Sequence, residues 1–261
     1  MTLRPDAADA THVATVRLTV GNTVSSTLHD AIGDRHSNRG PYTNTAVSTD
    51  VLAALGSVSA GLDGVNVRWF TTPADRAALG VLVIDATQAI VDDVQQSKDS
   101  YAWLRMTRDE IDTHRDGLTL DTQGLSPLIL AVAKILPATS RTAGDSFWLD
   151  QTRTVHTATA AAYGVITVAD PNDPILRLIG GRLLQRIHLA ATVAGLGLQH
   201  MNQVTERIDR DTQLGQPSTF GPRMDALVAQ PGRHVLSTFR LGHPVRAGRL
   251  SPRRPVSQVT R

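Results

Sequence analysis

The residues best suited to bind a ligand form one short run, Arg35-His36-Ser37-Asn38-Arg39, which is followed by Gly40-Pro41-Tyr42. Guanidinium groups offer planar, forked N–H donors that match phosphate oxygens, and a serine hydroxyl adds a neutral donor. The run lies between a short apolar helical segment and a predicted helix start at residues 48–50. It therefore predicts a phosphate site at a helix end and loop. The alternative is a solvated helix C-terminus, where arginines interact with the helix dipole.

Other common catalytic motifs are absent from the sequence. Gly195 and Gly197 do not form a dinucleotide fingerprint, because His200 replaces the third glycine and the segment follows a helix. There is no phosphate-binding loop of the Walker type, no Gly-x-Ser-x-Gly elbow and no His-Glu-x-x-His. The chain has no cysteine, and its nine histidines lack metal-ligand spacing, so we expect no metal site.

Positive charge is concentrated at the C-terminus, where residues 246–261 form a basic tail. No acidic residue follows Asp225, and the tail itself carries five arginines: Arg246, Arg249, Arg253, Arg254 and Arg261. The tail is either solvated, a phosphate clamp or a nucleic-acid patch. Its lack of aromatic residues argues against nucleic acid. The most apolar run, 128–136, is too short to cross a membrane and no signal-peptide core precedes it, so we expect a cytoplasmic protein with no membrane partner.

The hydrophobic pattern predicts an α+β protein that forms a single domain over residues 1–261. Strands are expected at 12–20, 65–72, 160–169 and 234–241. Helices are expected at 27–33, 49–59, 74–96, 101–113, 175–194 and 222–229. Residues 113–150 are the least regular part and form either a cover over a site or a helix packed between two loops.

Three segments together resemble the nitroreductase-like flavoproteins. The Arg35–Tyr42 run is similar to their opening motif, 190–198 to the end of their long helix with its Gly-Leu-Gly turn, and 239–244 with 251–255 to their closing strand and basic tail. Within that superfamily the chain is most similar to the Acg-like branch, the NAD(P)H nitroreductases built as two fused halves. The likeness runs from about residue 12 to residue 259.

The resemblance implies a nitroreductase-like fold, with a central, mainly antiparallel sheet flanked by helices. It also implies an FMN cofactor, NAD(P)H as electron donor, and nitroaromatic or quinone-type acceptors. Catalysis would then need no acid–base triad, and the catalytic residues stay unassigned. The cofactor-binding residues that it implies fall in three segments: Arg35, His36, Ser37 and Arg39 with Arg253 or Arg254 at the phosphate, and His200, Met201 and Asn202 against the flavin ring. For the last three, an ordinary entry into a strand is the alternative.

The sequence also departs from the Acg-like pattern. Nothing matches the N-terminal block, with its Ala-Pro-Ser and Asn-Thr-Gln-Pro-Trp motifs, that lines the flavin site in that branch. We therefore expect one of three functions: a flavoenzyme, a non-catalytic protein that binds or sequesters flavin, or a truncated fragment without ligand. The helix at 175–194 carries apolar residues on more than one face, which predicts a homodimer around a small-molecule site.

Overall fold

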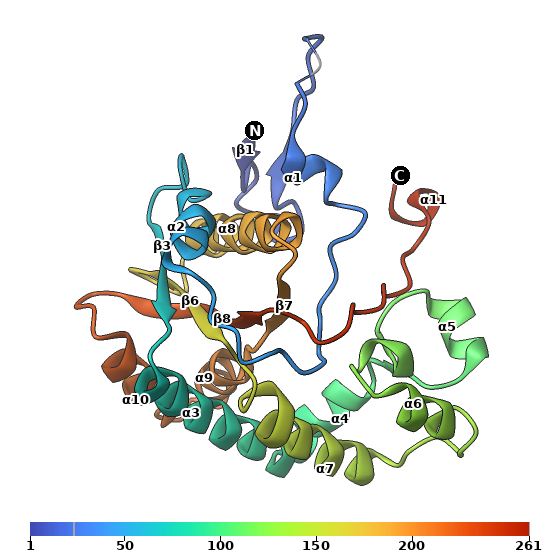
Figure 1. Ribbon diagram of the computed structural model, residues 1–261. Coiled ribbons are helices and arrows are strands. Elements are labelled where there is room, and N and C mark those ends of the chain that lie inside the picture. The colour runs from blue at the N-terminus through green and yellow to red at the C-terminus, as the bar shows by residue number, and fades with distance from the viewer. Residues whose placement is uncertain (23, 261) are drawn as a thin grey trace.

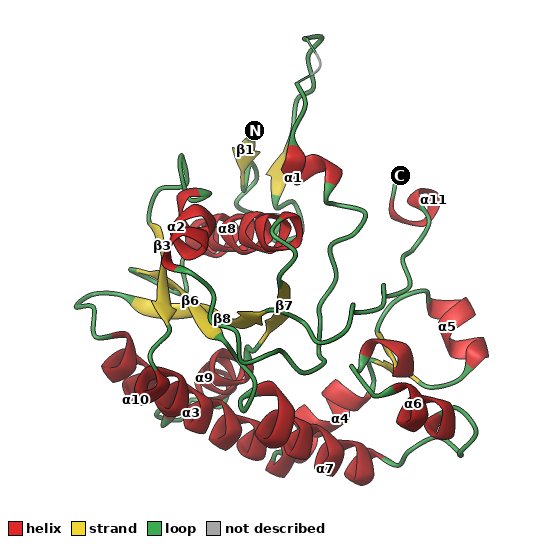
Figure 2. Cartoon of the chain, in the orientation of Figure 1, coloured by secondary structure: helices red, strands yellow, loops and turns green. Residues whose placement is uncertain are grey.

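The computed structural model describes residues 1–22 and 24–260, so Arg261 of the predicted tail lies outside the described residues. A four-stranded sheet crosses the middle of the molecule, with helices on both of its faces (Figures 1 and 2). In sheet order its strands are β3 (Val65–Phe70), β6 (Ala162–Val168), β8 (His234–Gly242) and β7 (Gly197–His200). Every neighbouring pair is antiparallel, which confirms the expected α+β class and the antiparallel sheet.

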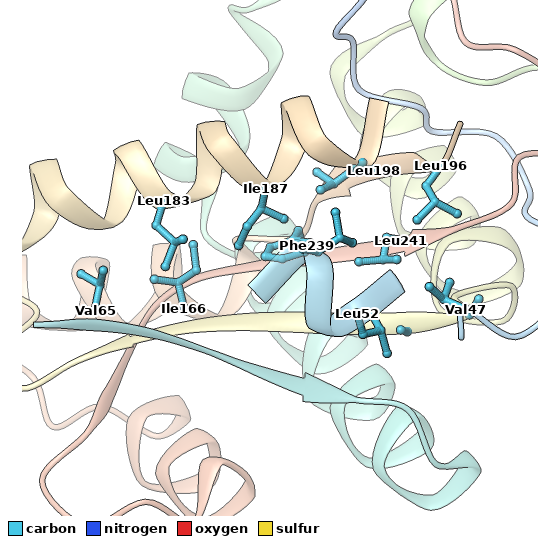
Figure 3. Close-up of a cluster of buried hydrophobic side chains, with 14 of the residues drawn as sticks. Val47, Leu52, Val65, Ile166, Leu183, Ile187, Leu196, Leu198, Phe239 and Leu241 are labelled. Carbon is cyan, nitrogen blue, oxygen red and sulfur yellow. The ribbon is translucent and has the colours of Figure 1, made fainter. Parts of the chain in front are cut away.

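Two helices cover one face of the sheet, α2 (Thr49–Ser57) and α8 (Pro174–Val193) (Figure 1). Asp173 caps α8 by accepting hydrogen bonds from the first helical N–H groups. Leu183 and Ile187 point down from α8 onto Ile166 and Phe239 of the sheet (Figure 3). Full burial of each such side chain contributes about 1.5–3 kcal/mol, so this cluster fixes α8 above β6, β7 and β8.

Three helices pack against the opposite face: α3 (Pro73–Asp92), α9 (Gln203–Gln213) and α10 (Phe220–Val228). A second buried cluster joins them to the sheet and includes Phe70, Leu79 and Tyr163. Because successive residues of a strand point to opposite faces, each central strand contributes to both clusters.

The remaining elements are short and lie around the sheet. The helices are α1 (Thr27–Asp30), α4 (Val94–Tyr101), α5 (Arg108–His114), α6 (Pro127–Ala133), α7 (Arg141–Gln151) and α11 (Val256–Val259). The strands are β1 (Thr2–Leu3), β2 (Ala14–Thr15), β4 (Leu104–Arg105) and β5 (Leu118–Thr119). A 3₁₀ turn spans Leu120–Thr122, and a π-helical turn, Thr152–His156, follows α7.

Two predicted elements differ from the structure. The strand expected at 12–20 is reduced to β2, because only its first residues meet a partner strand, β1. The helix expected at 101–113 is split, since Leu104 and Arg105 pair with β5 and Thr107 then starts α5 with a capping box to Glu110.

The other boundaries differ less, but several helices, among them α9 and α11, were not predicted. The helix expected at 74–96 ends at Asp92, because the Asp93 side chain caps a new helix, α4. The first helix is shorter than expected, ending at Asp30. Helix α9 was not predicted at all, and it follows β7 directly.

Candidate functional site

The Arg35–Tyr42 segment, the motif, runs along the free edge of β7. Ser37 forms a parallel bridge with Leu198, and the Asn38 N–H donates to the Leu198 carbonyl at 2.9 Å. Tyr42 then forms an antiparallel bridge with Pro244, just after β8. The motif is therefore attached to the sheet at both ends, although the sequence predicted only a loop.

The backbone around Arg39 is fixed by the side chain before it. Asn38 is 3% exposed, and its Oδ1 accepts a hydrogen bond from the Gly40 N–H at 3.0 Å. Its Nδ2 donates to the Arg246 carbonyl at 3.0 Å, which ties the start of the tail to the motif. Asparagine commonly stabilises turns in this way, by bonding to the backbone two residues on. This contact between the motif and the tail defines the place where a pocket forms.

A pocket of about 160 Å³ lies where three segments meet. The motif contributes Ser37, Asn38, Arg39 and Gly40; the tail contributes Arg246, Ala247, Gly248 and Arg249. The third segment belongs to the irregular region expected as a cover, and it contributes Asp121, Thr122, Gly124, Leu125, Pro127 and Leu130.

The pocket carries more positive charge than its own acids neutralise. Arg39 donates to the Thr122 carbonyl at 3.3 Å, and burial lowers the pKa of its guanidinium. No ion pair in the described part of the chain involves Arg39 or Arg246. Asp121 is the acid at the rim, and it already pairs with Lys134 at 2.9 Å and Arg249 at 3.5 Å. Such a surplus of cations favours an anionic ligand.

Arg35 lies beside the pocket and does not line it. Its Nη1 is 3.4 Å from His188 Nδ1, and His188 Nε2 donates to the His36 carbonyl at 3.0 Å. The His36 ring donates to the Asp34 carbonyl at 2.7 Å and lies against Gly248 of the tail. Arg35 and His36 therefore support the motif from the α8 side.

Two imidazoles in this region are neutral at pH 7. The rings of His188 and His200 meet edge to face at 5.3 Å between centroids. Burial lowers the pKa of His188 to about 3, with His200 next in effect. Burial also lowers the pKa of His200 to about 4, with Arg35 and Arg39 adding to the effect.

The next two residues expected at a flavin ring face elsewhere. The Met201 side chain has no exposed surface and packs in the second core cluster. Asn202 Oδ1 accepts hydrogen bonds from Ser237 Oγ at 3.0 Å and from the Thr238 N–H at 2.9 Å, so it joins α9 to β8. Of the three residues, only His200 lies next to the motif, because Met201 points to the opposite face of the sheet and the Asn202 side chain is held by β8.

The two tail arginines expected at the phosphate contact two different parts of the chain, and neither lines the pocket. The Arg253 guanidinium donates to the carbonyls of Ile32, Gly33 and Arg35, at 3.1–3.4 Å, and so holds the end of α1. Arg254 pairs with Asp116, next to α5. The tail instead brings Arg246 and Arg249 to the pocket, where sequence analysis gave them no separate role.

The pocket fits one end of FMN better than the whole molecule. Ser37 and the arginines provide the donors that a phosphate monoester needs. A volume of about 150 Å³ corresponds to a benzene-sized ligand, so a three-ring flavin attached to a phosphate in this pocket would extend outside it. The segment 120–130 forms one wall of this pocket. A Cβ on Gly124 would lie 2.4 Å from the Gly40 nitrogen, so this segment packs directly on the motif.

Across residues 1–22 and 24–260, no group of three or more His, Asp or Glu side chains is arranged to hold a metal ion. Within the same residues, every helix is too short or too polar to cross a membrane.

Similarity to known proteins exists at the level of structure. No family profile and no curated protein sequence matches the chain. An FMN-dependent nitroreductase from Mycobacterium smegmatis, solved with NADPH, is 12% identical with a TM-score of 0.57, over 90% of this chain and 97% of that one. A nitroreductase from Bacteroides fragilis with bound FMN is 14% identical with a TM-score of 0.50, over 88% and 95%.

The NADPH:FMN oxidoreductase from Vibrio harveyi is 14% identical, with a TM-score of 0.50 over 90% of this chain and 76% of that one. At such low identity these likenesses establish the fold and no activity. The chain has the nitroreductase-like α+β fold.

Proposed function

We propose that this chain binds FMN through its phosphate and is an FMN-dependent NAD(P)H oxidoreductase with weak turnover of nitroaromatic or quinone-type acceptors. One observation carries the proposal: Ser37 and Arg39 line a pocket whose cationic surplus has no matching carboxylates among the described residues. The structural relatives support the same cofactor, since the Mycobacterium smegmatis protein is FMN-dependent and the Bacteroides fragilis protein has bound FMN. Bound FMN would supply hydride transfer, and the protein would supply position and access.

The residues of this chain would divide the binding between them. Ser37 Oγ and the Arg39 guanidinium would contact the phosphate from the motif, and Arg246 and Arg249 would approach it from the tail. Arg35 and Arg253 would act on the site through the backbone at the end of α1, with Arg254 holding the tail further along. His200, neutral and close to Arg35, would contact the flavin ring.

A second function is favoured by the segment 120–130. That segment packs on the motif through Gly124 and through the Arg39 bond to the Thr122 carbonyl. A covered pocket holds a ligand and limits access to a second substrate. The alternative is therefore a flavin-binding or flavin-sequestering protein, in which residues 113–150 are the cover within a single domain.

We also propose that the chain forms a homodimer, although not through α8. The large apolar side chains of α8 are buried or half-buried, apart from Val193. Exposed apolar side chains gather instead in two other places: Val16, Leu18 and Val20 after β2, and Leu128, Ile135 and Leu136 around α6. Burial of such residues against a second copy is the usual solution. Sedimentation at micromolar concentration should show a dimer, and a monomer would contradict the proposal.

Two measurements separate these functions. Titration of the purified protein with FMN, followed by flavin fluorescence, should show saturable binding; an absence of binding would leave a protein without this ligand. Steady-state oxidation of NADH and NADPH by the FMN-loaded protein, with a nitroaromatic or quinone acceptor, then distinguishes the enzyme from the flavin-holding protein.

A further inference from the structure

Arg240 is a buried cation whose partners are all uncharged. It lies in β8 with no exposed surface. Its Nε donates to Gln199 Oε1 at 2.7 Å and its Nη2 to the Gly40 carbonyl at 2.7 Å. Its Nη1 is 3.1 Å from both the His156 carbonyl and Thr159 Oγ1. One guanidinium thus joins the motif, β7 and the turn after α7.

Burying an arginine in this way needs an explanation. No ion pair in the described part of the chain includes Arg240. A buried charge without an opposite charge is costly, and apolar residues of similar volume are often at least as stabilising. The cost is consistent with a role beyond packing. The Arg240 guanidinium offers five N–H donors in a fixed fork, and no neutral or aliphatic side chain can supply that set.

The Arg240 side chain acts together with Tyr42. The guanidinium carbon lies 4.1 Å from the centroid of the Tyr42 ring, which is a cation–π contact. The Tyr42 hydroxyl donates to the Asn38 carbonyl at 2.8 Å. Since Arg240 itself holds the Gly40 carbonyl, this pair fixes the residue on each side of Arg39. The direction in which Arg39 leaves the backbone is therefore set by two buried side chains that do not line the pocket.

We propose that Arg240 is a positioning residue for the phosphate-binding site: it holds the Asn38–Gly40 backbone through Gly40 and Tyr42, and its unpaired charge raises the preference of the site for a phosphate monoester. The inference rests on the proposed binding of FMN. Arg240 touches no ligand in this arrangement and acts through Arg39. A merely structural residue would change the stability of the fold without changing which ligand the site prefers.

The test compares FMN with riboflavin, which is the same flavin without phosphate. Dissociation constants for both ligands are measured in the parent, in Arg240→Met and in Arg240→Lys. Arg233→Met is the matched control, because Arg233 also donates to a buried strand carbonyl, that of Thr167, at the far end of β8. We expect Arg240→Met to reduce the preference for FMN by up to about tenfold, which is less than full loss of the Arg39 contact, because Arg240 acts only through Arg39. Arg233→Met should keep the parent preference.

Arg240→Lys separates geometry from charge, because lysine keeps the charge and loses the fork. It should restore only part of the preference; full restoration would overturn the positioning role. Tyr42→Phe removes one hydroxyl and keeps the aromatic ring, so it tests the same unit if Arg240→Met does not fold, and it should lower the FMN preference severalfold. Unchanged preference in the folded variants would overturn the inference while leaving the proposed function intact. A parent that does not prefer FMN would overturn the proposed function and this inference with it.

Discussion

Arg39 is the residue on which the proposed phosphate site depends most. It lies in the pocket, carries an unpaired charge in the described structure and is held by its neighbours on both sides. The motif could be recognised from sequence because Arg35, Ser37 and Arg39 are adjacent. The sequence could not show that Arg39 lines the pocket and Arg35 does not, because Arg35 contacts His188, a residue far away in the chain.

The first prediction concerns the charge of Arg39. Arg39→Ala should weaken FMN binding about tenfold to a hundredfold, because a charge-assisted hydrogen bond contributes roughly 1.5–3 kcal/mol. Fluorescence titration measures the change. Arg182→Ala on α8, away from the pocket, is the control and should bind FMN like the parent. Equal affinity in Arg39→Ala and the parent would show that the phosphate lies elsewhere.

The second prediction concerns pH and His200. Its folded pKa of about 4 lies below the unfolded value of about 6.5, so the unfolded chain binds a proton more readily between these values. The contribution of His200 to the free energy of unfolding is fully present above pH 6.5 and is lost as the pH falls toward 4. The contribution lost at pH 5 is on the order of 1–2 kcal/mol. Urea unfolding of His200→Phe from pH 7 to pH 4.5 should show a shallower decline than the parent; parallel curves would contradict it.

At the scale of elements, segment 120–130 decides how much of a ligand the pocket admits. Gly124 allows the segment to approach the motif closely. Its φ is +74°, and its α-carbon lies against the backbone of the motif. A side chain there meets both a backbone penalty and a clash with Gly40.

The third prediction separates those two effects. Gly124→Ala should loosen 120–136 from the motif and increase its cleavage by a protease, with little change in the rest of the fold. Gly61→Ala is the matched control, since Gly61 has a φ of +71° and open space around its α-carbon. Limited proteolysis followed by mass spectrometry locates the cuts. Equal cleavage in the two variants would mean that the contact with Gly40 does not hold the segment.

Sequence patterns predicted the elements that carry their own signal. Helices α3 and α8 have apolar residues at regular helical spacing, and β6 is a continuous apolar run between turn residues. Helix α9 was missed because it is mostly polar and buries few apolar side chains, among them Val204. The strand expected at 12–20 has the right alternation, but alternation does not reveal whether a partner strand exists.

At the scale of the whole molecule, the site depends on contacts between distant segments. The bridge from Tyr42 to Pro244 sets where the tail leaves the sheet, and this places Arg246 and Arg249 at the pocket in preference to Arg253 and Arg254. No local pattern encodes such a contact. The same holds for Arg240, whose position in an apolar strand gave no sign that it supports the motif.

The fourth prediction is that nitroreductase turnover is weak or absent. In the proposed arrangement the pocket anchors the phosphate, and its volume of about 160 Å³ leaves the flavin ring outside it, where this pocket does not fix the ring. A misplacement of about 1 Å can reduce the rate about a hundredfold. Steady-state NADH and NADPH oxidation by FMN-loaded protein should therefore lie far below the roughly 10 per second that is common among enzymes. A turnover number near that value would establish the enzyme and exclude the sequestering protein.

The central claim is that this pocket recognises the phosphate of FMN. Isothermal titration of the parent protein with FMN and with riboflavin, at the same low salt concentration, tests it most directly. Because the charge-assisted contacts exist only with the phosphate, FMN should bind at least about tenfold more tightly, and the difference should shrink as salt is added. Equal affinity for the two flavins, or no binding of either, would contradict the account.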